Sequence, residues 1–96
     1  MEIVSVDLVF TPPSEGGKEC LPTGDGYSPH ACTMNGQEYL PVRLSEIPDT
    51  SAHGETVRAV MELMYPNRLD YDPILTGEEF RLLEGDRVVA TARTLN

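Results

Sequence analysis

The chain has 96 residues, and sixteen acidic residues against seven lysines and arginines give it a formal net charge of −9 at pH 7. This length allows one hydrophobic core, so we expect a single domain over residues 1–96. Apolar residues make up 40% of the chain, which is typical of a folded domain and excludes disorder. The negative charge argues against nucleic acid and anionic membranes as partners and is compatible with a basic protein partner.

The N-terminal stretch MEIVSVDLVF has no positively charged segment and no cleavage site of small residues, so it does not predict a secretory signal. No apolar run approaches the length of a membrane span. We therefore expect a cytoplasmic protein, in which the two cysteines are free thiols.

Residues 2–10 predict the first strand. Val4, Val6, Leu8 and Phe10 fall on one face, which is wholly apolar, as a half-buried strand requires. The two prolines at positions 12 and 13 end the strand, because proline cannot donate a hydrogen bond to a sheet.

The middle of the chain predicts a hairpin and one ambiguous segment. Strands are expected at residues 27–34 and 38–44, because the Asn-Gly pair between them is a strong hairpin signal. Residues 57–65 fit helical and strand periodicity equally well, although the surrounding strands and Pro66 favour a strand. The acidic segment that follows, up to Pro73, predicts a solvated loop.

The C-terminal segment from residue 78 predicts a second hairpin. Phe80 and Leu82 share one face, the turn falls at residues 84–87, and every second residue from Val88 onward shares a face opposite to Val89. Together these elements predict an all-β fold. A small closed antiparallel barrel of about six strands is expected, since closure removes the edges that no helix covers.

Catalytic and metal-binding patterns are weak. The Gly-Lys pair at Lys18 lacks the earlier glycine and the following Ser or Thr of a phosphate-binding loop, so no nucleotide is expected. His30 and Cys32 share a strand face, and with Cys20 and His53 they form the weak alternative of a metal or thiol site, but no Cys-x-x-Cys pair is present. No metal, cofactor or catalytic residue is therefore predicted.

Four pieces of the chain carry a resemblance, in order along the sequence. They are Glu15-Gly16-Gly17-Lys18, Gly26-Tyr27-Ser28-Pro29-His30, the segment from Gly54 to Pro66, and the closing stretch from Glu79 to Val89. Together they resemble the C-terminal β-barrel domain (domain 3) of bacterial elongation factor Tu. The resemblance covers nearly the whole chain and implies a Greek-key barrel with a strand at residues 57–65. In that barrel the loop from Ser14 to His30 joins the first strand to the second.

The family's barrel binds the T-arm of tRNA and packs against a GTPase domain. This chain has Ser28 and His30 where the family has Arg and Gln, and Asp86 and Val88 in the closing turn. We therefore expect a stand-alone, non-enzymatic, acidic protein-binding module of a regulatory or immunity type, or a mimic of the elongation-factor barrel. A translation-associated tRNA-binding protein is the alternative, and it requires a basic stripe on one face.

Four residues are candidates for binding in such a module. Tyr27 and His30 are expected on the rim of the barrel, and Arg81 and Arg87 belong to the closing hairpin. Each also has a purely structural interpretation, as barrel packing, a solvated strand end, or a partner of a nearby glutamate.

Overall fold

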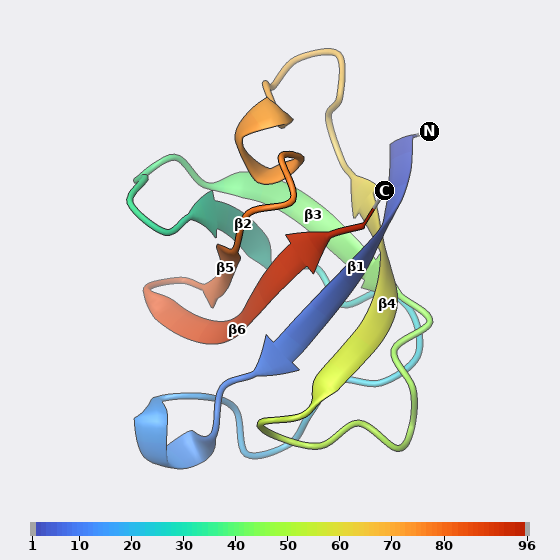
Figure 1. The fold of residues 1–96 in the computed structure, drawn as a ribbon, viewed down its shortest axis with the longest axis vertical. Coiled ribbons are helices and arrows are strands. Elements are labelled where there is room, and N and C mark those ends of the chain that lie inside the picture. The colour runs from blue at the N-terminus through green and yellow to red at the C-terminus, as the bar shows by residue number, and fades with distance from the viewer. Residues whose placement is uncertain (1, 96) are drawn as a thin grey trace.

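Alternating apolar residues along six strands close this chain into a barrel (Figure 1). The computed structural model describes residues 2–95. The strands are β1 (Glu2–Phe10), β2 (His30–Thr33), β3 (Leu40–Ser45), β4 (Thr56–Leu63), β5 (Phe80–Glu84) and β6 (Arg87–Thr94). Two short 3-10 turns, η1 (Pro13–Glu15) and η2 (Asp72–Ile74), lie in the connections. The predicted all-β class and closed antiparallel barrel are confirmed.

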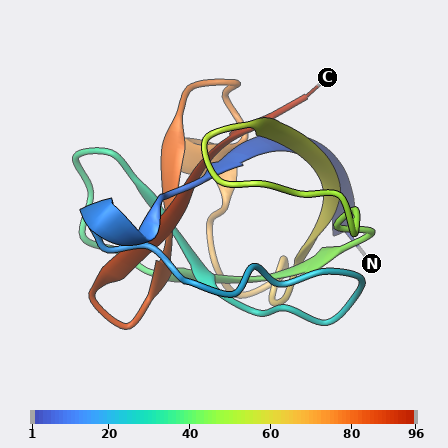
Figure 2. The ribbon, with the colours of Figure 1, turned by 90° about the horizontal axis from the view of Figure 1, so that it is seen from below.

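The order of strands around the barrel is β1-β4-β3-β2-β5-β6, and every pairing is antiparallel. β1 pairs with both β4 and β6, so the sheet closes on itself, as the view along the barrel shows (Figure 2). β2, β3 and β4 follow one another as neighbours, and β1 returns beside β4, which is a Greek-key arrangement. The long loop from β1 to β2 therefore runs across one end of the barrel.

The first strand has the predicted bounds and inward face. Val6, Leu8 and Phe10 are buried, and Val4 packs against the same core. The ambiguous segment is a strand: in β4 every second residue from Val57 to Leu63 is buried, which is the period of a strand and not of a helix.

The predicted strand at residues 27–34 is too long, because β2 contains only His30–Thr33. Tyr27 makes a single bridge to Leu44, and Gly24 and Gly26 adopt positive φ angles that interrupt an extended chain. The other half of this hairpin, predicted at 38–44, begins later, at Leu40. The hairpin itself is confirmed, with a turn from Thr33 to Gly36.

The predicted faces of the C-terminal strand are wrong at its start. A β-bulge lies where Leu82 pairs with Ala90 and Leu83 pairs with Val88, which leaves Val89 as the extra residue. The bulge turns Val89 into the core, where it is 1% exposed, while Val88 is only half-buried. Counting every second residue from the turn therefore gives the wrong inward face, because the bulge adds one residue to the strand.

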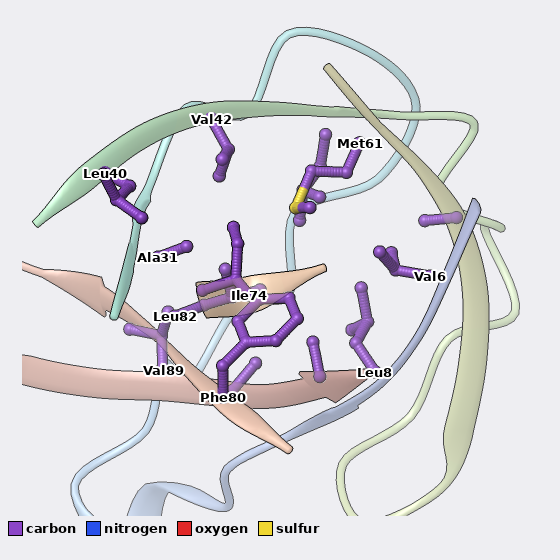
Figure 3. Close-up of a cluster of buried hydrophobic side chains, with 14 of the residues drawn as sticks. Val6, Leu8, Ala31, Leu40, Val42, Met61, Ile74, Phe80, Leu82 and Val89 are labelled. Carbon is purple, nitrogen blue, oxygen red and sulfur yellow. The ribbon is translucent and has the colours of Figure 1, made fainter. Parts of the chain in front are cut away.

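The hydrophobic core is one cluster of side chains that point into the barrel (Figure 3). Two of its residues come from the connection between β4 and β5, which the sequence predicts to be a solvated loop. Ile74 is fully buried, and Tyr71 is buried and donates a hydrogen bond from its hydroxyl to the carbonyl of Pro41 at 2.7 Å. This loop therefore forms part of the core. Within residues 2–95 no helix has the length and apolar character needed to cross a membrane.

Candidate functional site

Tyr27, a predicted binding residue, belongs to a polar cluster with Lys18 and Glu84. The long loop after β1 carries Lys18 and Tyr27 to the end of β5, where Glu84 precedes the closing turn. The Tyr27 hydroxyl donates a hydrogen bond to the Glu84 carboxylate. Lys18 Nζ lies 2.7 Å from the same carboxylate oxygen and 5.3 Å from the centre of the Tyr27 ring. One carboxylate therefore joins two parts of the loop to the hairpin.

The protonation of this cluster is set by its contacts. Burial raises the pKa of Tyr27, and the hydrogen bond and negative charge of Glu84 raise it further. The hydrogen bonds from Lys18 and then Tyr27 lower the pKa of Glu84 below its ordinary 4.5, and the charge of Arg87 adds to this effect. At neutral pH the phenol therefore keeps its proton and the carboxylate stays ionised. These shifts run opposite to those of a phenolate base or a carboxylic acid catalyst.

Arg87 stands across the closing hairpin from Glu84 in the strand register. It is exposed, so its guanidinium is accessible to solvent and its charge reaches the cluster from outside. The structure therefore brings Tyr27 and Arg87 together around a glutamate that sequence reasoning did not single out.

Arg81, another predicted binding residue, anchors a loop. Its Nε donates to the carbonyl of Thr33 at 3.2 Å, and its terminal nitrogen donates to the carbonyl of Gly36 at 2.8 Å. The same nitrogen lies 3.1 Å from the thiol of Cys32, which donates to the Gly36 carbonyl at 3.1 Å. Arg81 is half-buried, and its Nε and one terminal nitrogen contact groups within the protein.

His30, the fourth candidate, is exposed at the start of β2. Its ring lies 6.0 Å from the ring of Tyr39, and the two planes are tilted by 42°. Tyr39 belongs to the loop between β2 and β3 that Arg81 holds. His30 and Arg81 are therefore next to the same loop, and Tyr27 and Arg87 belong to the Glu84 cluster.

The four residues of the alternative metal site have separate surroundings. Cys20 is an exposed free thiol and Cys32 is a buried one, as expected for unpaired cysteines. His53 donates through Nε2 to the carbonyl of Lys18 at 2.6 Å. Among residues 2–95 no group of three or more His, Cys, Asp or Glu side chains is placed to hold a metal ion.

Several cationic side chains lie next to carboxylates. Arg58 and Arg93 lie on opposite sides of Asp7 in the strand register, so an acid separates them. Arg58 Nε is 3.1 Å from Asp7, and Arg43 is 3.8 Å from Glu62. With Lys18 on Glu84, three of the seven cations are thus paired with carboxylates. At these places acids lie among the cations that the tRNA alternative would use.

A scan against models of known protein families finds no match to this chain, and neither does a search of curated proteins.

Acidic residues line a surface depression with a volume of about 520 Å³. Asp25, Glu46 and Glu62 contribute carboxylates, and Arg43 lies among them. Glu46 has a φ of 58°, a strained angle for a side chain of its kind, and its backbone N–H donates to Asp25 Oδ1 at 2.9 Å. This hydrogen bond offsets the backbone strain at Glu46 and stabilises the turn there.

Sequence reasoning missed two exposed apolar residues next to these candidates. Met34 is 45% exposed and Tyr39 is 41% exposed, and both belong to the loop between β2 and β3. Both residues fall inside the strands predicted from the sequence at 27–34 and 38–44. Because β2 ends at Thr33 and β3 begins at Leu40, both lie in the loop instead, where a side chain has no fixed face.

Proposed function

We propose that this chain is a non-enzymatic, cytoplasmic binding module that takes a basic segment of another protein. The observation that carries the proposal is the distribution of charge. Lys18, Arg43 and Arg58 are paired with carboxylates, and Arg81 is turned to the backbone, while most carboxylates remain exposed on a chain of net charge −9. Such a surface attracts a cationic partner and accelerates its encounter.

The absence of activated groups in the clusters described above supports a binding role over catalysis. Burial and then Glu84 raise the pKa of Tyr27, so it stays protonated near neutral pH. Hydrogen bonds from Lys18 and then Tyr27 lower the pKa of Glu84, so it stays ionised. Cys32 is fully buried, so its thiol has no access to a substrate. A binding module needs none of these groups to titrate.

The resemblance to the third domain of elongation factor Tu is part of the proposal. A small closed barrel is compatible with that family, and four sequence pieces follow its order, although a six-stranded barrel alone does not identify it. A barrel of this kind would act as a mimic that occupies a protein partner, in a regulatory or immunity-type role. Interleaved acids argue against tRNA as that partner.

Affinity capture with the purified chain tests the proposal. A bacterial lysate is passed over the immobilised protein at low and at moderate salt, with and without nuclease. We expect to capture a basic protein whose binding persists after nuclease treatment and weakens at the higher salt concentration. Recovery of tRNA that nuclease abolishes would contradict the proposal and favour the translation-associated alternative.

A further inference from the structure

The loop between β2 and β3 (residues 34–39, here the β2–β3 loop) presents apolar side chains to solvent. It projects from the side of the barrel (Figure 1). Met34 and Tyr39 stand at its two ends with nearly half of each side chain exposed. Exposed large apolar side chains gathered on one element commonly mark a contact surface.

This loop is anchored to β5 at its turn. The three contacts of Arg81 with Thr33, Cys32 and Gly36 tie it to β5. Gly36 also packs tightly, since a Cβ there would lie 2.1 Å from the Thr33 hydroxyl. A loop that is already ordered loses little conformational entropy when a partner binds, which favours affinity.

Carboxylates line two depressions beside the β2–β3 loop. The first, of about 280 Å³, is lined by Glu38 and Asp70. The second, of about 490 Å³, is lined by Met34, Glu78 and Glu79, with Arg93 also present. Thr33 and Pro73 line both depressions, so the two adjoin one another between the loop and η2.

We propose that the β2–β3 loop and its two flanking depressions dock a basic segment of another protein. In this complex an apolar side chain of the partner contacts Met34 and Tyr39, and its lysines or arginines contact Glu38 in the first depression and Glu78 and Glu79 in the second. The proposal rests on the proposed function and assigns it a surface. Charge complementarity selects this occupant, since a second copy of the chain would bring the same carboxylates against one another.

Synthetic peptides test the chemistry of the occupant. The first probe alternates arginine and leucine, the second replaces leucine by glycine, and the third replaces arginine by serine. Each is labelled with a fluorophore, and binding to the full chain is followed by fluorescence anisotropy. We expect the arginine-leucine peptide to bind at least about fivefold more tightly than either control, because it meets both the apolar and the acidic parts of the surface.

Matched variants test the location. Tyr39→Ser is expected to weaken binding of the arginine-leucine peptide by about fivefold to tenfold, and E78Q/E79Q by a similar factor. The control Tyr65→Ser removes an equally exposed tyrosine elsewhere, at 50% exposure, and should leave the affinity unchanged. All of these side chains are exposed, so unfolding curves measured by circular dichroism should coincide with that of the parent chain.

The outcomes separate this inference from the proposed function. Two results would contradict the proposed docking surface but not the proposal of a basic partner. They are equal binding of the arginine-glycine and arginine-leucine peptides, and equal weakening by Tyr65→Ser and Tyr39→Ser. If no arginine-containing peptide binds, both proposals fail. Dimerisation of the free chain in sedimentation experiments, abolished by Tyr39→Ser, would identify a second copy as the occupant and overturn the inference.

Discussion

The hydroxyl of Tyr27 donates a hydrogen bond to the carboxylate of Glu84, 57 residues further along the chain. This contact, with Lys18 on the same carboxylate, closes the long loop after β1 onto the C-terminal hairpin. It explains why a loop rich in glycine has a defined path across the end of the barrel. The first three predictions concern this cluster.

Replacing Tyr27 by phenylalanine should destabilise the fold. The change removes the donor to Glu84 and keeps the ring under Lys18. Because Glu84 is partly exposed and retains its lysine, we expect a loss of about 1 kcal/mol in the free energy of unfolding. Urea titration followed by circular dichroism measures it, and Tyr65→Phe, at an exposed site, is the control. Equal stability of the two variants would mean that the hydrogen bond contributes nothing.

The stability of the protein should fall in acid partly through Glu84. Its pKa is lower in the folded state than the ordinary 4.5, so the unfolded chain takes up the proton first as the pH falls. The contribution is present above about pH 4.5 and is lost as the pH falls through the folded-state pKa. Thermal unfolding at a series of pH values should show a shallower acid limb for Glu84→Gln. Parallel acid limbs for the two proteins would contradict this assignment.

Tyr27 should titrate at a higher pH than an ordinary phenol. Its folded-state pKa is raised, so its contribution to stability is complete below pH 10 and is lost as the pH rises through the folded-state value. Absorbance of tyrosinate, followed during an alkaline titration, should show a late step that Tyr27→Phe removes. A late step that persists in this variant would belong to another tyrosine.

Gly17→Ala should cost more than most surface substitutions. A Cβ at this position would lie 1.7 Å from the carbonyl oxygen of Thr11, which is a backbone atom with little freedom to move. We expect the loop to shift and the free energy of unfolding to fall by about 2 kcal/mol. Glu15→Ala, two residues earlier and exposed, should change it by less than about 0.5 kcal/mol. Equal small effects in urea titrations would show that the loop adapts.

Arg81→Lys should loosen the β2–β3 loop and expose Cys32. Lysine keeps the charge but cannot make the planar, multiple contacts that the guanidinium makes with Thr33, Cys32 and Gly36. In a Cys20→Ser background, the rate at which a thiol reagent labels Cys32 should rise by about tenfold, because burial now protects it. Unchanged labelling would mean that the barrel wall, and not Arg81, shields the thiol.

The candidate site was only partly predictable. Tyr27, His30, Arg81 and Arg87 were chosen from their places in the sequence, and they fall into two neighbourhoods on the barrel. Most of their partners could not be named, because they come from other elements and meet these residues only in the folded barrel. Arg81 is an example. Its place in the closing hairpin predicted a cation available for binding, but in the structure its guanidinium donates to backbone carbonyls of Thr33 and Gly36.

The sequence by itself determined the class of fold and the position of most strands, because alternation, proline stops and an Asn-Gly turn act over a few residues. β1 follows its pattern from end to end. Tertiary structure alone decided the bulge at Val89, the burial of Ile74 in a loop, and the bond between Tyr27 and Glu84. The last two depend on residues far away in the chain, which meet only after the barrel has closed, whereas the bulge is a break in strand pairing that alternation does not mark.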